Sequence, residues 1–379
     1  MVYLIYLDNV AASFVEDEVL DIFYNTTKKY YANPNSIHKL GREENKMISD
    51  STLRIANMLK VLKDEIIYTS GATESNNLAI KGLCLSYKNY GKHILISSLE
   101  HNSITSSVVS LERLGFEVEV IPVTDKGIVD IESLKNMLRD DTILVSVTSV
   151  DSELALRQPI EEIASILKDY PNCHFHTDAT QSIGKVTIDY SNVDLITINP
   201  HKFHGLDNYG ILVKKKNVRL TPLIEEGKST TIYRAGTPSL ANVLALEKAL
   251  EIALTNQEAR YNYLKELGDM IKSHLSKYKN VSINSRENSL PSIINFSLIG
   301  EKSLTILDKF EEHNIILSAK TSCCPITTPS KLVYALTKDK QKASSSIRVS
   351  LSYKTTKEEV EEFMKVFDLI YKEIYHGEV

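Results

Sequence analysis

The sequence has few cysteines and no long hydrophobic run, and each shortage excludes a class of protein. Four cysteines are spread over 379 residues, and none of them forms a CxxC pair or a zinc-ligand spacing. Reduced thiols in a cytoplasmic protein are therefore the simplest interpretation. No apolar run approaches the roughly 18–20 residues that span a bilayer. The short apolar segment 1–8 lacks a basic leader and is typical of a strand, not of a signal peptide.

An excess of positive charge, internal repeats and low-complexity tracts are missing as well. The net charge is −5, which gives no electrostatic reason to expect direct binding of nucleic acid. What is present is ordinary for a soluble globular chain, with 42% hydrophobic and 25% charged residues. The length predicts two domains with ample material for a core.

Strand-like and helix-like segments alternate through the first two thirds of the chain. Helix-like segments at 16–31 and 41–62 come first. The expected strands follow at 65–69, 93–97, 118–122, 142–147, 173–177, 193–198 and 210–213, with helices at 73–88, 103–114, 130–139 and 159–169. This repetition predicts an α/β fold with a mainly parallel seven-stranded sheet covered on both faces. Ligands of such sheets bind beyond the carboxyl ends of the strands.

The pattern changes near residue 239. A long amphipathic helix over 239–278 is expected, followed by shorter strands near 281–284, 292–297 and 346–351. These segments predict a smaller α+β domain. We therefore expect a large cofactor-binding domain of residues 15–259, and a small domain built from residues 1–14 and 260–379.

Two of the expected strands are followed by residues that suit one cofactor. Asp178 closes the run at 173–177, and Lys202 follows the run at 193–198 beside His201. Pyridoxal phosphate (PLP) needs a lysine that forms an imine and an acid that keeps its pyridine nitrogen protonated. A surface lysine and a helix-capping aspartate are the alternative, and the pair alone leaves both interpretations open.

Further candidate groups follow other strands. In the stretch 70–77, Gly71 permits a tight turn, and the N–H groups of a helix start near Ala72 and Thr73 form an anion site. A simple helix cap is the alternative, but the downstream lysine and aspartate favour a phosphate site. His101 could stack on a flat ring and move protons, although a lone loop histidine is usually uninvolved.

The C-terminal part contributes a cysteine and an arginine. The polar, proline-containing stretch 317–330 predicts an exposed loop, in which Cys323 or Cys324 is better suited to reactivity than to packing. Lys320 would favour a thiolate there, while an incidental thiol or a regulatory cysteine pair are the alternatives. Arg348 lies in an apolar strand, where an unpaired guanidinium is costly. It could hold a substrate carboxylate or form a structural salt bridge.

Together these residues closely resemble the NifS/IscS-type cysteine desulfurases, within the class-V aminotransferase family of fold-type I PLP enzymes. Order and spacing agree over essentially the whole chain, and the match at 69–82 is highly specific. The other matching stretches are 6–9, 33–38, 100–101, 178–182, 201–202, 234–237, the cysteine loop and 346–348. The resemblance implies a fold-type I transferase that converts L-cysteine to L-alanine and forms a persulfide.

The resemblance also assigns roles to individual residues. Lys202 would bind PLP as an imine and move protons, His101 would stack on its ring, and Cys323 would accept the substrate sulfur. Asp178 would hold the pyridine nitrogen, and Gln181 and Ser152 would lie near the ring hydroxyl. The remaining positions are Ala72, Thr73, Asn199, His201 and the partner subunit's Thr237 at the phosphate, and Arg348 and Asn35 at the substrate.

The same resemblance implies a cytoplasmic homodimer that passes sulfur to an acceptor protein, such as an iron–sulfur scaffold or a thiolation enzyme. Three departures from the family pattern stand out: Ser152 replaces an asparagine, Asn199 precedes Pro200 where Ser-Gly is usual, and Lys320 replaces a glycine. They keep two alternatives open. One is a selenocysteine lyase or carbon–sulfur β-lyase on the same scaffold, and the other is a catalytically weakened homologue that binds partners.

Overall fold

The computed structural model describes residues 4–227, 229–320 and 328–375, and its central element is a seven-stranded sheet. The strand order is β2-β8-β7-β6-β5-β3-β4. Only β8 runs antiparallel to its neighbours, β2 and β7, and the other pairs are parallel. The strands are β2 (Ile66–Thr69), β3 (His93–Ser97), β4 (Glu117–Ile121), β5 (Thr142–Ser146), β6 (His174–Asp178), β7 (Leu195–Ile198) and β8 (Gly210–Lys214). The predicted mainly parallel seven-stranded sheet is confirmed.

Helices cover this sheet on both faces, as the alternation of buried side chains along each strand requires. In β3, Ile94 and Ile96 pack in one core cluster and Leu95 packs in the other. The first cluster includes side chains of the π-turn Leu78–Gly82, which continues α3 (Ala72–Asn77), and of α4 (Leu83–Tyr87) and α5 (Asn102–Glu112). The opposite cluster includes α6 (Ile131–Met137) and α7 (Ile160–Leu167).

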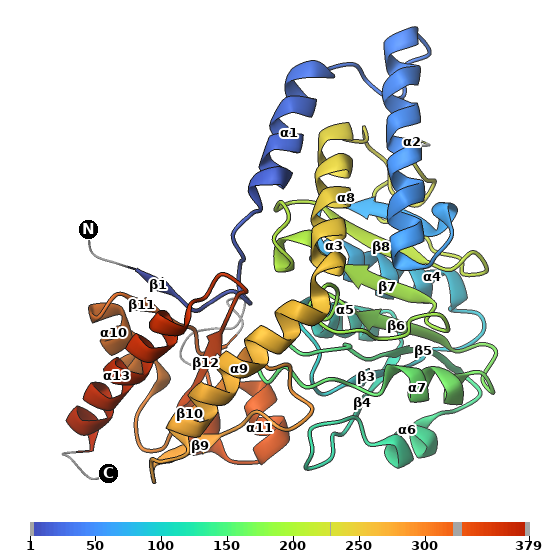
Figure 1. Cartoon of the computed structure of the whole chain (residues 1–379). Coiled ribbons are helices and arrows are strands. Elements are labelled where there is room, and N and C mark those ends of the chain that lie inside the picture. The colour runs from blue at the N-terminus through green and yellow to red at the C-terminus, as the bar shows by residue number, and fades with distance from the viewer. Residues whose placement is uncertain (1–3, 228, 321–327, 376–379) are drawn as a thin grey trace.

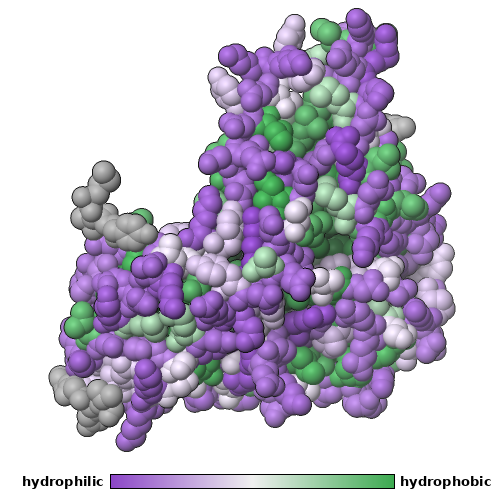
Figure 2. Space-filling view, viewed as in Figure 1, coloured by the Kyte–Doolittle hydropathy of each residue, from purple (hydrophilic) through white to green (hydrophobic). Residues whose placement is uncertain are grey.

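Three helices rise together beyond the sheet. α1 (Asp17–Lys29) and α2 (Lys39–Leu59) both pack against α8 (Leu240–Thr255), and Figure 1 shows them projecting at the top of the molecule. Figure 2 shows apolar side chains gathered between these helices on the viewed face. The exposed apolar residues of this region include Leu20, Tyr24, Ile37, Leu40 and Leu53.

The prediction of one long helix over 239–278 is wrong in one respect, because the structure has two helices there. α8 ends at Thr255, and α9 (Gln257–Leu275) begins two residues later. Asn256 between them adopts φ −110° and ψ 14°, which is not helical. Asparagine competes for backbone hydrogen bonds and favours such breaks. The change of direction carries the chain from the large sheet toward the smaller one (Figure 1).

The smaller sheet has the order β12-β10-β9 and is antiparallel. The N-terminal β1 pairs with β11 in parallel beside it, so the first residues lie with the C-terminal part of the chain. The elements are β1 (Ile5–Tyr6), β9 (Val281–Ile283), β10 (Ile293–Leu298), α10 (Ser303–Glu312), β11 (Ile315–Ile316), α11 (Lys331–Thr337), α12 (Lys340–Ser344), β12 (Ser346–Ser350) and α13 (Lys357–Ile374). The division at residue 259 remains a prediction, and it falls inside α9.

Aromatic packing supports this smaller sheet and provides a test of its core. Phe367 on α13 is fully buried, with ring centroids 5.8 Å from Phe296 and 5.1 Å from Tyr278. We expect Phe367→Ala to lower the free energy of unfolding by about 3–5 kcal/mol, because it removes contacts and leaves a cavity. Phe367→Leu should cost clearly less. Urea unfolding followed by circular dichroism measures both, and equal midpoints for the two variants would contradict this packing.

Candidate active site

A cavity of about 280 Å³ lies at the carboxyl ends of the parallel strands. Strands β6 and β7 end there, and the segments after β3 and β5 line the same space. The structure brings together many of the residues that the sequence singled out. Those that line this one cavity are Ala72, Thr73, His101, Ser152, Asp178, Gln181, Asn199, His201, Lys202 and Arg348.

Lys202 ends the short 3₁₀-helix Pro200–Lys202 that follows β7. Its Nζ donates a hydrogen bond to the carbonyl oxygen of Ala11 at 2.5 Å. Burial lowers the pKa of Lys202 to about 8, and the positive charge of Arg348 adds to this effect. A substantial fraction of this amine is therefore neutral near pH 7–8, which is what a nucleophilic lysine requires.

Asp178, at the end of β6, lies in a network that reaches His101. Its Oδ2 accepts from Asn76 Nδ2 at 2.9 Å, and its Oδ1 accepts from the backbone N–H of Thr180 at 2.9 Å. The same Asn76 amide donates to Ser103 Oγ at 2.8 Å, and Ser103 Oγ lies 2.8 Å from His101 Nδ1. Asn76 thus joins the acid and the imidazole. Sequence reasoning placed Asn76 in a specific motif but gave it no role.

His101 caps helix α5 with its own ring. Its Nδ1 accepts from the backbone N–H of Ser103 at 3.1 Å. A ring nitrogen that accepts a hydrogen bond carries no proton, so the neutral imidazole carries its proton on Nε2. The cap therefore fixes both the position and the tautomer of a side chain that lines the cavity.

The start of α3 and the segment after β7 meet at one end of the cavity. Gly71 has φ +140°, and a Cβ on Gly210 would lie only 2.7 Å from the Gly71 Cα. The close backbone approach needs glycine at position 210, and the positive φ favours glycine at position 71. Asn199 is buried, and its Oδ1 has no hydrogen-bond partner. Burial and the charge of Lys202 lower the pKa of His201 to about 4.

Arg348 on β12 closes the opposite side and is almost fully buried, with 1% of its surface exposed. Its Nη2 donates to Asp8 Oδ1 and to Ser318 Oγ, both at 2.7 Å, and its Nη1 donates to the carbonyl oxygen of Ser152 at 2.8 Å. The Nε of Arg348 has no partner. Asp8 was missed as a functional residue, although a buried arginine in a strand signals that an acid must lie nearby.

Three positions predicted from the sequence are not among the residues lining this cavity. Asn35 is exposed on the connection between α1 and α2. Thr237 lines a separate cavity of about 210 Å³ with Ser70 and Arg234. Cys323, like Cys324, lies outside the described residues, so the structure says nothing of its place.

The residues of the cavity fit a flat, anionic cofactor. Thr180 Oγ1 and Arg348 Nε are buried hydrogen-bond donors without a partner, and each belongs to a lining residue. Buried polar groups without partners are rare in folded proteins, and a ligand would satisfy them. The cavity also combines a carboxylate with an amine of lowered pKa, as a PLP site requires.

Comparisons with known proteins agree with this geometry. The sequence profile described as "Aminotransferase class-V" matches residues 5–363, so the chain belongs to the class-V aminotransferase family, whose members generally depend on PLP. The relatives place it more narrowly. A "NifS/IcsS protein homolog" from Lactobacillus delbrueckii is 38% identical over 97% of both chains. "Cysteine desulfurase IscS" from Dictyoglomus turgidum is 36% identical over 98% of this chain and 95% of its own.

Solved structures point to the same group. A "NIFS-LIKE PROTEIN" superposes with a TM-score of 0.91 at 29% identity, covering 97% of this chain and all of its own. A structure titled "SspA in complex with cysteine" gives a TM-score of 0.81 at 28% identity, covering 93% of this chain and 99% of its own. Within the family, the chain is therefore of the NifS/IscS cysteine desulfurase type. Among the described residues, no helix has both the length and the apolar character to cross a membrane.

Glu100 is a further buried group beside the cavity to which sequence reasoning gave no role of its own. Its Oε1 accepts from Ser97 Oγ and from the backbone N–H of Thr148, both at 2.7 Å, and its Oε2 has no partner. Burial raises the pKa of Glu100 to about 8, and the negative charge of Asp178 adds to this. The group is therefore a neutral acid at pH 7.

This raised pKa predicts a pH-dependent stability. Between about pH 4.5 and 8 the unfolded chain loses the Glu100 proton while the folded chain keeps it, so stability falls as pH rises. Glu100→Gln should match the parent at pH 4.5. Above pH 4.5 it should become more stable than the parent, and the difference in unfolding free energy should grow by at most about 1.4 kcal/mol per pH unit. Urea unfolding at a series of pH values measures this. The exposed Glu361→Gln serves as the control, and parallel stability curves for Glu100→Gln and the parent would contradict the assignment.

Proposed function

We propose that this chain is a PLP-dependent cysteine desulfurase that converts L-cysteine to L-alanine and carries the released sulfur as a persulfide on Cys323. The observation that carries the proposal is the convergence of Lys202, Asp178, His101 and Arg348 on one cavity. Relatives at 32–38% identity over nearly the whole chain, several named cysteine desulfurase, support it.

Each end of the cavity has a task in this reaction. When bound, PLP supplies an electron sink that stabilises negative charge on the substrate carbon. Asp178, held by Asn76, would keep the pyridine nitrogen protonated. Ala72, Thr73, Asn199 and His201 would hold the phosphate, where helix N–H groups and the surplus of positive charge favour an anion. Gln181 and Ser152 would lie near the ring hydroxyl.

Lys202 and His101 supply the mobile protons. The lowered pKa of Lys202 leaves its amine neutral often enough to take a proton from a substrate carbon held beside it. His101, with its proton on Nε2, would stack on the ring and deliver a proton as the product forms. Both side chains line the cavity, so neither task requires a rearrangement of the sheet.

Arg348 would bind the substrate carboxylate. Its Nε has no partner, and three other contacts already fix the plane of the guanidinium. A carboxylate from the substrate would satisfy the remaining donor through a charge-assisted hydrogen bond.

The segment around Cys323 is attached at both ends next to this arginine. Before it, Ser318 Oγ accepts from Arg348 Nη2. After it, Ser330 Oγ donates to Glu153 Oε2 at 2.5 Å, one residue from Ser152 in the cavity wall. The attachment points support a thiol that reaches the substrate sulfur. In the proposed step the sulfur bonds to the Cys323 thiolate, the substrate C–S bond breaks, and a proton replaces sulfur on the carbon to give alanine.

The proposed enzyme is a homodimer. The apolar side chains between α1, α2 and α8 (Figure 2) offer a surface for a second copy. Asn35 lies on the connection between α1 and α2, which is at the top of the molecule in Figure 1, and it is not among the residues that line the cavity of its own chain. A substrate contact by Asn35 would therefore be made in the other subunit, as would a phosphate contact by Thr237. We further propose a cytoplasmic location and a protein acceptor for the sulfur, such as an iron–sulfur scaffold or a thiolation enzyme.

The sulfur-carrying cysteine is tested by mass spectrometry of the loop peptide after a brief incubation with L-cysteine. We expect a one-sulfur adduct on Cys323, and none in Cys323→Ala. Alanine release by that variant should fall by roughly two orders of magnitude or more, because the acceptor thiolate is lost. Cys324→Ala is the matched control and should keep both the adduct and the rate. Sulfide formation at the parent rate by Cys323→Ala would favour a direct lyase instead.

The role of Arg348 is tested by comparing L-cysteine with cysteamine, which lacks the carboxylate. Arg348→Lys should raise the KM for L-cysteine by roughly 10- to 100-fold, because a lysine cannot keep the three existing contacts and still offer the Nε–H donor in the same plane. Binding of cysteamine, followed by the spectrum of the bound cofactor, should change little. Arg286→Lys, outside the cavity, is the control. An equal loss for both ligands would argue that Arg348 is only structural.

A further inference from the structure

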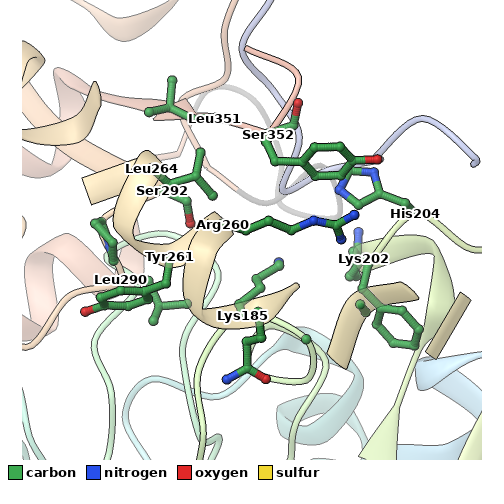
Figure 3. A pocket seen from close by; sticks show the side chains of 16 residues that line it. Lys185, Lys202, His204, Arg260, Tyr261, Leu264, Leu290, Ser292, Leu351 and Ser352 are labelled. Carbon is green, nitrogen blue, oxygen red and sulfur yellow. The ribbon is translucent and has the colours of Figure 1, made fainter. Parts of the chain in front are cut away.

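A second, smaller cavity of about 60 Å³ lies behind the proposed cofactor site, and four basic side chains are among the residues that line it. Figure 3 shows Lys185, Lys202, His204 and Arg260 directed toward this space. None of the sixteen residues that line it is an aspartate or a glutamate. Lys202 lines both cavities, so the rear cavity lies directly behind the proposed reactive amine.

Lys185 links the two cavities through one hydrogen bond. Its Nζ donates to Gln181 Oε1 at 2.6 Å, and Gln181 lines the front cavity while Lys185 lines the rear one. The two residues are four apart, and Gly184 with φ +75° ends the turn between them. Within the described parts of the chain, Gln181 is the only side chain that forms a hydrogen bond or ion pair with Lys185.

This contact decides which way the Gln181 amide faces. In its protonated form the Lys185 amine only donates, so it selects the carbonyl oxygen of the amide and turns Nε2 to the other side. Nε2 has only a long contact of 3.5 Å to the carbonyl oxygen of Val10. Its donor capacity is therefore largely unused in a cavity-lining residue.

We propose that Lys185 is a positioning residue that holds the Gln181 amide with its N–H donor toward the cofactor's ring oxygen. This inference rests on the proposed function and goes beyond it, since Lys185 touches neither the cavity of the reaction nor any group assigned to the substrate. Without Lys185, the amide could rotate and present its oxygen to an oxygen, which would repel instead of bind.

The electrostatic surroundings of Lys185 agree with this role. Burial lowers the pKa of Lys185 to about 7, and the positive charges of Lys202 and Arg348 lower it further. Arg260 on the same cavity is positively charged and has Glu16 at 3.8 Å. Burial lowers the pKa of His204 on the same cavity to about 4, so its ring is neutral at pH 7. A lysine without an acidic partner is costly to keep in such a place. The hydrogen bond to Gln181 gives a specific reason for its presence there.

The experiment measures PLP binding to the apoprotein and the pH midpoint of the visible band of the bound cofactor. Lys185→Met removes the donor at nearly equal length. It should weaken PLP binding about five- to tenfold, the loss expected for one hydrogen bond. It should also shift the midpoint to higher pH, because the ring oxygen loses a donor that stabilises its anion. Lys185→Arg keeps a donor and should restore both values to within about twofold.

Two controls separate positioning from packing. Lys214→Met removes a different, buried lysine, whose Nζ donates to the Val218 carbonyl oxygen at 2.8 Å, and it should leave both readouts unchanged. In a Gln181→Leu background, Lys185→Met should have no further effect, because Lys185 acts through Gln181. Lys185→Gln provides a second replacement in case the methionine variant folds poorly, and it should also shift the midpoint.

The outcomes are distinguishable. An unchanged midpoint and affinity in Lys185→Met overturn the role of Lys185 alone. The same loss in the parent and Gln181→Leu backgrounds also overturns it, since the effect would then be general packing. A wild-type apoprotein that takes up no PLP and shows no visible band overturns the proposed function and this inference together.

Discussion

The buried guanidinium of Arg348 is the interaction on which the arrangement of the site depends. A fully buried cation needs compensation from acids and acceptors around it. Here the partners come from three distant segments: Asp8 near the N-terminus, Ser318 before the cysteine loop, and the carbonyl oxygen of Ser152 after β5. These contacts tie the N-terminal segment and the smaller sheet to the edge of the large sheet. Removing Asp8 would leave a buried charge without its acid, a far larger disturbance than the loss of a surface ion pair.

A second constraint is the number of basic side chains around the two cavities. Burial lowers their pKa values and so reduces their positive charge. Lys202 and Lys185 have pKa values near 8 and 7, and His201 near 4, so several of these groups are partly or wholly neutral at pH 7. Burial thus limits the repulsion that a fully charged set would produce. An anionic ligand would raise these pKa values again, because its negative charge favours the protonated form of the neighbouring bases. In the proposed function, these positive charges would hold the phosphate of the cofactor at one end of the cavity and the carboxylate of the substrate at the other.

Much of this architecture follows from the sequence, because hydrophobic periodicity reports which residues are buried. The strand expected at 93–97 matches β3 residue for residue, and Asp178 and Lys202 lie at strand ends as the order of elements requires. The break at Asn256 was missed, since α8 and α9 keep a continuous helical pattern across it. Asn76, Glu100 and Lys185 had no assigned roles because their partners lie on other elements, and spacing along the chain does not reveal tertiary neighbours.

Two of the departures from the family pattern, at Ser152 and Asn199, can be explained by the atoms that make the contacts there. Arg348 binds the backbone carbonyl of Ser152, an acceptor that every residue type supplies, so that contact does not require asparagine there. At Asn199 the amide lies 3.6 Å from where a Gly71 Cβ would stand, so a polar group still faces the turn that leads into α3. What the substitutions change is the set of side-chain donors around the ring and phosphate. In the proposed function, Gln181 would carry more of the contact with the ring oxygen, so the orientation of its amide would matter more in this chain than in relatives with the usual asparagine.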